Sequence, residues 1–231
     1  MRDFPFDIVG FDLDGTLVDS NRDIGPAINH ALASIGRSGV PDDETRNLIG
    51  GGSRLMLERA LDFTGGALPP EEFEALFTTM LAHYEDHIAD QTVPYEGCLA
   101  ALDALAARGV KLAVVTNKNE HLARKLLGHL GMTHLFASIM GGDTLGPGRS
   151  KPARYMIDET IARVRGAQDD GEEAMRFAMV GDSTYDVGAA RNAGVPVVAL
   201  SFGYADVPVA DLGGDVLIDH FDKLVGALEK L

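Results

Sequence analysis

Phe4-Pro5-Phe6-Asp7-Ile8-Val9-Gly10-Phe11 runs directly into Asp12-Leu13-Asp14-Gly15-Thr16. The first part is mostly apolar, as expected for a buried strand of a parallel sheet. Alternate side chains of an extended chain share one side, so Asp12 and Asp14 project together while Leu13 points toward the core. Two neighbouring carboxylates repel each other unless a cation or a proton lies between them. The pattern therefore predicts a functional site at the end of the first strand.

The composition restricts the kinds of partner. The 231 residues include 20 Lys and Arg against 35 Asp and Glu, a formal net charge of −15. A nucleic-acid or anionic-membrane surface requires a basic patch, so the balance argues against both. An anionic substrate would have to be attracted locally, by a metal ion or by a few placed cations. No long heptad or apolar edge stands out, and the sequence leaves open a monomer or a homodimer.

Cysteine usage and hydropathy favour a cytoplasmic protein. Cys98 is the single cysteine, which excludes an intrachain disulfide and a cysteine-rich metal site. Asp3 and Asp7 stand where a secretory signal would have a basic and then an apolar stretch. No apolar run approaches the roughly 20 residues that cross a bilayer.

Strand and helix patterns alternate in the C-terminal part of the chain, which predicts a doubly wound α/β fold with a mainly parallel sheet. After the first strand, the expected strands are 110–115, 138–140, 177–180, 196–200 and 216–218. The expected helices are 98–107, 120–130, 152–164, 184–193 and a closing helix from Phe221. Residues 166–174 form a polar, acidic segment that is typical of a surface loop.

Residues 19–92 have a different pattern. Segments 20–35, 46–63 and 71–88 look helical, and no strand pattern interrupts them. Gly50-Gly51-Gly52-Ser53-Arg54 follows no strand, so it is expected to join helices of this insertion. We therefore predict a catalytic core of residues 1–18 and 93–231, an all-helical cap domain of residues 19–92, and a return hinge at residues 90–96.

Ligand sites of open parallel sheets lie beyond the carboxyl ends of the strands. Polar residues follow the predicted strands at these positions, and all should meet at one edge of the sheet. They are Asp12, Asp14, Thr116, Asn117, Lys118, Lys151, Asp182 and Asp186. Some also suit simpler roles: Asp182 and Asp186 a helix N-terminus, Thr116 and Asn117 a strand end, and Lys151-Pro152 an ordinary loop.

Phosphoryl transfer is the chemistry that needs this set. Asp12 can attack phosphorus to form an aspartyl-phosphate, and Asp14 can protonate the leaving alcohol and later take a proton from water. Carboxylates suit Mg²⁺, with Asp12 and Asp182 as ligands, Asp14 contributing nearby, through a backbone carbonyl, and Asp186 supporting the site. Lys151, Thr116 and Asn117 can hold the phosphoryl oxygens.

The sequence resembles the haloacid dehalogenase superfamily. Asp12-x-Asp14-Gly15-Thr16, Thr116, Lys151 and Gly181-Asp182-x-x-x-Asp186 correspond to its four motifs, in order. The resemblance implies a Rossmann-like core and a helical cap of the C1 type. Asp14 is implied to distinguish phosphatases and phosphomutases from dehalogenases. Val115-Thr116-Asn117-Lys118 and Phe202-Gly203-Tyr204 are most similar to the phosphoglycolate phosphatase group.

The resemblance implies a Mg²⁺-dependent phosphatase that acts on a small phosphorylated metabolite, with 2-phosphoglycolate favoured. A phosphosugar mutase or a pyrophosphatase on the same fold remains open, as does a non-catalytic binding protein. The specificity residues are not fixed by the sequence. Arg54 is a candidate substrate-binding residue of the cap, with Arg46 and Arg59 as other cations there.

Overall fold

The computed structural model describes residues 4–166 and 174–231. Its main sheet has six strands in the order β5-β4-β1-β6-β7-β8, and every neighbouring pair is parallel. The strands are β1 (Ile8–Phe11), β4 (Lys111–Val115), β5 (Ser138–Met140), β6 (Phe177–Gly181), β7 (Val197–Leu200) and β8 (Val216–Ile218). The chain winds outward from β1 in both directions, which confirms the predicted doubly wound α/β fold.

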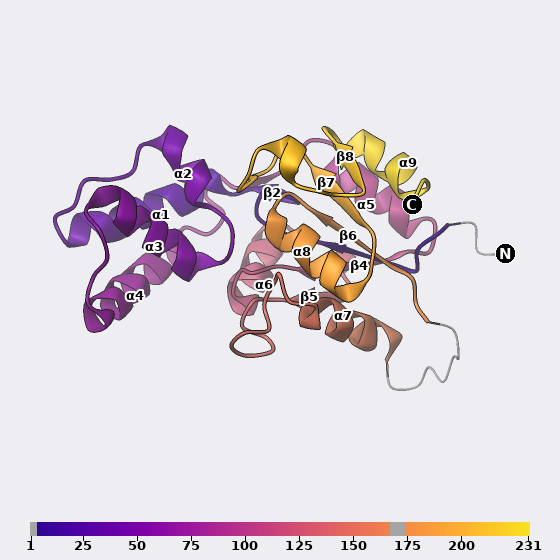
Figure 1. Cartoon of the computed structure of the whole chain (residues 1–231), viewed down its shortest axis with the longest axis horizontal. Coiled ribbons are helices and arrows are strands. Elements are labelled where there is room, and N and C mark those ends of the chain that lie inside the picture. Colours follow the sequence, from indigo (N-terminus) through magenta and orange to yellow (C-terminus); the bar gives the residue numbers. More distant parts are fainter. Residues whose placement is uncertain (1–3, 167–173) are drawn as a thin grey trace.

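Helices cover both faces of this sheet (Figure 1). One face packs against α5 (Cys98–Ala106), α6 (Glu120–His129) and α9 (Leu224–Leu228), and the other against α7 (Tyr155–Arg165) and α8 (Thr184–Ala193). Successive strand residues feed opposite layers: Val9 and Val114 belong to the first core, whereas Ile8 and Val115 belong to the second. Burial on both faces explains why the strands read as continuous apolar runs.

A helical segment lies beside the sheet (Figure 1), between β1 and β4 in the sequence. It consists of α1 (Asn21–Ser34), α2 (Asp42–Leu48), α3 (Ser53–Thr64) and α4 (Pro70–Asp86), and α4 packs along α1. The expectation of continuous helix over 46–63 is wrong. Gly50, Gly51 and Gly52 all have positive φ, which an L-residue rarely adopts, and they separate α2 from α3.

Two short strands connect the helical segment to the sheet. β2 (Val18–Asp19) and β3 (Val93–Pro94) pair antiparallel. Behind them, the buried Asp23 carboxylate accepts hydrogen bonds from the backbone N–H groups of Gln91 and Thr92 and from the Thr92 hydroxyl. One carboxylate of α1 thus fixes the returning chain.

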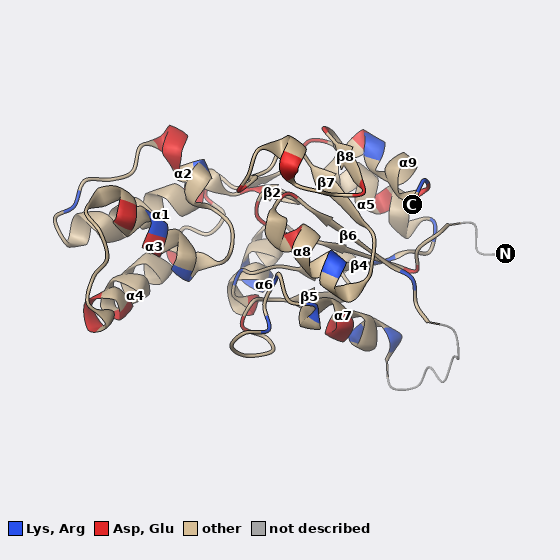
Figure 2. Cartoon of the chain, viewed as in Figure 1, with Lys and Arg blue, Asp and Glu red and all other residues tan. Residues whose placement is uncertain are grey.

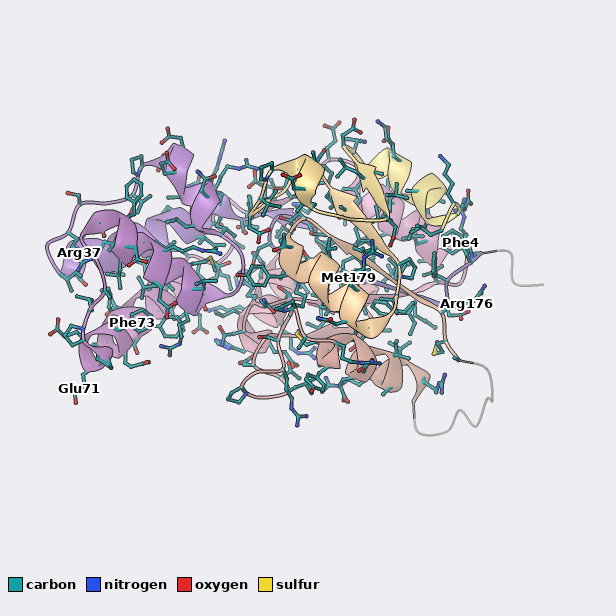
Figure 3. The ribbon with its side chains drawn as sticks, viewed as in Figure 1. Phe4, Arg37, Glu71, Phe73, Arg176 and Met179 are labelled. Atoms are coloured by element: carbon teal, nitrogen blue, oxygen red, sulfur yellow. The ribbon has the colours of Figure 1, made fainter. Side chains whose placement is uncertain are left out.

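The opposite end of the sheet lies far from the helical segment (Figure 3). Here Arg176 Nη2 donates to the carbonyl of Phe4, 3.0 Å away. The first strand is shorter than the apolar run 4–11 suggested. Its residues 4–7 lead into the sheet without belonging to it, although Phe4 and Phe6 are buried. Most of the predicted polar loop at 166–174 lies outside the described residues.

Charged residues are distributed over both parts of the ribbon (Figure 2). Among the described residues, no helix is both long and apolar enough to cross a bilayer. Three short 3₁₀ helices complete the described elements, at Thr133–Leu135, Val209–Asp211 and Phe221–Lys223. The last of these replaces the first turn of the predicted closing helix.

Candidate active site

Three carboxylates converge at the carboxyl ends of β1 and β6. Asp12 follows β1, Asp182 follows β6, and Asp186 lies in the first turn of α8. One oxygen of each lies within 4.8 Å of one oxygen of the others. We call these residues the acidic cluster. Because the strands are parallel neighbours, the topology brings their ends together.

Lys151 lies within the acidic cluster. Its Nζ is 2.6 Å from Oδ1 of Asp186 and 3.0 Å from Oδ1 of Asp12, and its side chain is almost entirely removed from solvent. The two carboxylates raise the pKa of Lys151 against the opposing effect of burial. Three carboxylates and one ammonium leave two negative charges, which matches a divalent cation.

Burial also changes the pKa values of two carboxylates of the acidic cluster. Desolvation raises the pKa of Asp12 to about 6, although Lys151 and Thr116 oppose the shift. Desolvation and the neighbouring Asp186 and Asp12 raise the pKa of Asp182. A cation placed between the two carboxylates would therefore stabilise their ionised forms.

A close turn holds Asp182. Thr16 Oγ1 donates to its Oδ1 and the backbone N–H of Tyr204 donates to its Oδ2, each at 2.6 Å. Gly15 makes this approach possible. Its φ is +85°, and a Cβ at this position would lie 2.3 Å from Oδ2 of Asp182. Tyr204 also links the site to β2, since its hydroxyl donates to Asp19, 2.5 Å away.

Asp186 is fully engaged by protein donors. Its Oδ2 accepts from the N–H groups of Asp182 and Ser183 and from the Ser183 hydroxyl, and its Oδ1 accepts from Lys151. The contacts with Ser183 form a capping box at the start of α8. Asp186 thus positions the Lys151 ammonium and the backbone at Asp182 and Ser183.

The structure does not bring the side chain of Asp14 into the acidic cluster. Its carboxylate accepts instead from Lys118 Nζ at 2.9 and 3.1 Å and from the Ser20 hydroxyl at 2.7 Å. The sequence places Lys118 at a strand end and predicts no role for it. A role could have been predicted from its position two residues after Thr116, because a lysine that is buried at such a strand end needs a charged or polar partner.

Asn117 supports Lys151. Its side-chain amide exchanges two hydrogen bonds with the backbone of Lys151, at 2.9 and 3.0 Å. Thr116 is buried just after β4, and its side chain is close enough to Asp12 to lower the pKa of that carboxyl. Thr116 therefore lies beside the acidic cluster, whereas the amide of Asn117 acts through Lys151.

Arg54 does not reach this site. Its guanidinium forms two hydrogen bonds with Glu74 of α4 and lies over the rings of Phe73 and Phe77. Half of its side chain is exposed, and it lines a separate surface pocket. The expected role as a cap residue facing the site is corrected by this geometry: α3 points Arg54 toward α4.

Two adjoining cavities share Asp12, Asp14, Gly50, Gly51 and Asn117. The first continues toward the helical segment, where its wall is largely apolar and is formed by Ile24, Ala27, Ile28, Ile49, Met56, Met80, Leu81 and Leu122. The second contains the polar groups Lys151, Asp182, Ser183, Tyr185 and Tyr204. The acidic cluster thus lies at the polar end of a space that becomes apolar beneath the helices.

A family model for haloacid dehalogenase-like hydrolases matches residues 9–200. The chain belongs to the haloacid dehalogenase-like hydrolases. The match confirms the resemblance drawn from the motifs, and it covers the β1 and β6 ends that carry the acidic cluster.

Two relatives of this hydrolase are named phosphoglycolate phosphatase. The chain is 42% identical to a phosphoglycolate phosphatase of Agrobacterium fabrum, covering 96% of this chain and 92% of the relative. It is 38% identical to one of Mesorhizobium japonicum, covering 94% and 92%. A crystal structure of a predicted phosphoglycolate phosphatase from Haemophilus somnus superposes with a TM-score of 0.85 at 30% identity, covering 96% of this chain and 97% of that one. The hydrolase is thus similar to phosphatases along nearly its whole length.

Proposed function

We propose that this hydrolase cleaves a small phosphate monoester, with 2-phosphoglycolate as the favoured substrate, by way of an aspartyl-phosphate on Asp12. The convergence of Asp12, Asp182 and Lys151 at one edge of the sheet is the observation that carries the proposal. Its relatives named phosphoglycolate phosphatase support the choice of substrate.

The donor set fits Mg²⁺. The acidic cluster offers hard carboxylate oxygens, and its charge together with Lys151 is that of a divalent site. Asp12 and Asp182 are the proposed ligands, with the backbone near Asp14 beside them, because Asp186 is occupied by protein donors. When bound, the ion would neutralise charge that develops on the phosphoryl oxygens.

Asp12 attacks phosphorus, and the bond from phosphorus to the substrate's leaving oxygen breaks. Asp14, which lies outside the cluster, must bind a proton before this step and donates that proton to the leaving oxygen. In the second half Asp14 takes a proton from water, the water oxygen bonds to phosphorus, and the bond to Asp12 breaks. Lys151 holds Asp12 in position, and Lys151 with Thr116 holds the phosphoryl oxygens.

The helical segment supplies the remainder of the substrate site. We assign it as the cap within the predicted domain 19–92, since Gly50, Gly51 and Met56 line the same cavity as Asp12 and Asp14. The backbone of Gly50–Ser53 leads into α3, and N–H groups at a helix start favour an anion such as the glycolate carboxylate. The cover of helices excludes bulk water during the reaction.

A metal-dependent phosphate-release assay tests the proposal. The purified chain is assayed with 2-phosphoglycolate, sugar phosphates and pyrophosphate, with Mg²⁺ and after chelation. We expect stoichiometric phosphate from phosphoglycolate, dependent on Mg²⁺ and lost in Asp12→Asn. Isomerised sugar phosphate without free phosphate would assign a mutase instead, and pyrophosphate as the best substrate would assign a pyrophosphatase. Full activity of Asp12→Asn contradicts the mechanism.

A further inference from the structure

Tyr84 is connected to Asp14 through a single lysine. Nζ of Lys118 lies 2.7 Å from the Tyr84 hydroxyl oxygen and 2.9 and 3.1 Å from the two carboxylate oxygens of Asp14. Lys118 is 8% exposed and Tyr84 is 5% exposed. A lysine ammonium carries three N–H donors, and these three acceptors match them.

Burial makes both partners of Lys118 necessary. An ammonium removed from water is costly unless each donor is paired, so losing one acceptor weakens the position of the whole group. Burial raises the pKa of Tyr84 to about 12, so its hydroxyl stays neutral and accepts from the cation. The position of the ammonium, and with it that of the Asp14 carboxylate, depends on the Tyr84 oxygen.

The two acceptors come from different parts of the fold. Asp14 follows β1 of the sheet, whereas Tyr84 lies near the end of α4 in the helical segment. Both line the same cavity. A movement of the helical segment away from the sheet would withdraw Tyr84 and leave the pair of Lys118 and Asp14 behind in the core. The third contact of the ammonium therefore exists only while the helices cover the site.

We propose that Tyr84 is a positioning residue, which fixes Asp14 through Lys118 when the helical segment covers the site. The inference rests on the proposed function, in which Asp14 gives its proton to the leaving oxygen. Tyr84 touches none of the reacting atoms and exchanges no proton. Its effect is to align the Asp14 carboxyl, so proton donation to the leaving group is coupled to the closed position of the helices.

The test uses Tyr84→Phe, which keeps the ring and removes the oxygen. Two aryl phosphates are compared: phenyl phosphate, whose leaving group needs a proton, and 4-nitrophenyl phosphate, whose leaving group needs little help. The quantity measured is kcat/KM, which covers the steps up to departure of the leaving group. We expect a loss on the order of 10-fold for phenyl phosphate and a clearly smaller one for 4-nitrophenyl phosphate.

Two further variants make the result specific. Tyr155→Phe removes the hydroxyl of a half-exposed tyrosine of α7 that lines neither cavity, and it should leave the ratio of the two kcat/KM values unchanged. Lys118→Met removes the intermediary, so Tyr84→Phe should add no further change in that background. Thermal unfolding checks that each variant is folded.

An equal loss for both substrates, or no loss, overturns the positioning role, because a merely structural defect does not distinguish leaving groups. Additive effects of Tyr84→Phe and Lys118→Met also overturn it. Metal-dependent turnover by the wild type, abolished in Asp12→Asn, tests the proposed function separately. If the wild type cleaves neither aryl phosphate nor phosphoglycolate, the proposed function fails and the inference falls with it.

Discussion

Nζ of Lys151 and Oδ1 of Asp186 lie 2.6 Å apart, and the two side chains are 1% and 0% exposed. The same ammonium lies 3.0 Å from Asp12 Oδ1. One buried cation therefore joins the proposed nucleophile after β1 to the first turn of α8. This pairing gives Lys151 a structural role beside the chemical role that we propose for it.

Replacing Lys151 by Met should affect activity and stability together. Loss of one charged donor to the phosphoryl group lowers kcat about 10²- to 10³-fold. Leaving Asp12 and Asp186 without their cation lowers the free energy of unfolding by about 3–5 kcal/mol. Steady-state kinetics and urea unfolding measure the two effects. Lys111→Met, at the exposed start of β4, is the matched control and should change neither. Similar losses in both variants would rule out a special role for Lys151.

Metal binding should weaken as the pH falls below about 6. The pKa of Asp12 is raised to about 6 in the folded, metal-free protein, so its folded value exceeds its unfolded value of 3.8. Protonated Asp12 therefore adds to the free energy of unfolding of the metal-free protein. This contribution is complete only below the unfolded pKa and is lost as the pH rises through about 6. Ionised carboxylates bind the ion, so Mg²⁺ should raise Tm more at about pH 7.5 than at about pH 5.

Thermal unfolding with and without Mg²⁺, at a series of pH values, provides this measurement. The apparent Kd should increase by up to about 10-fold per pH unit for each proton that the ion displaces from Asp12 or Asp182. A rise in Tm that is independent of pH would show that Asp12 does not lose a proton on metal binding.

Gly15→Ala should abolish the metal response. A Cβ here would lie 2.3 Å from Asp182 Oδ2, in addition to the strain of positive φ. Gly109→Ala is a close control, because its φ of +79° is nearly the same but nothing lies within 4 Å of the added carbon. Both variants should lose about 1 kcal/mol of stability from strain, and Gly15→Ala more. A normal Mg²⁺-induced shift of Tm in Gly15→Ala would contradict the proposed role of Asp182.

Asp23→Ala should loosen the connection between the helical segment and the sheet. The change leaves the buried N–H groups of Gln91 and Thr92 without their acceptor. We expect the free energy of unfolding to fall by about 2–3 kcal/mol. Asp43→Ala, on the exposed first turn of α2, should lower the free energy of unfolding by only a few tenths of the loss expected for Asp23→Ala. Urea unfolding compares the two, and equal losses would mean that the Asp23 contacts contribute nothing beyond a surface carboxylate.

The convergence of Asp12, Asp182 and Lys151 could be inferred from the sequence because it follows from topology. Parallel strands end at one edge, so the residues after them meet whatever the details of packing. The buried strands and strongly periodic helices can be predicted from their hydrophobic patterns, with errors of a few residues at their ends. The glycines at 50–52 do join two helices, as expected, but the apolar pattern continues across them, so the predicted helical span 46–63 ran through the break.

The contacts of Tyr84 and Arg54 could not be predicted in this way. Tyr84 meets Lys118 across 34 residues, and only the tertiary contact of α4 with the chain between β4 and α6 brings them together. The sequence favours Arg54 as the substrate-binding cation of the helical segment and offers Arg46 as another cation there. Arg54 forms hydrogen bonds with Glu74, whereas Arg46 donates to the carbonyls of Phe202 and Gly203 in the loop after β7. The direction of a long surface side chain depends on its neighbours in space.

The central claim is that Asp12 receives the phosphoryl group. Its most direct test is a rapid acid quench of the wild-type protein during turnover of ³²P-labelled 2-phosphoglycolate with Mg²⁺. We predict label bound covalently to the protein, recovered in the peptide that contains Asp12, and absent from Asp12→Asn. Phosphate release at the full rate with no labelled protein at any quench time, or label that persists in Asp12→Asn, would contradict the account.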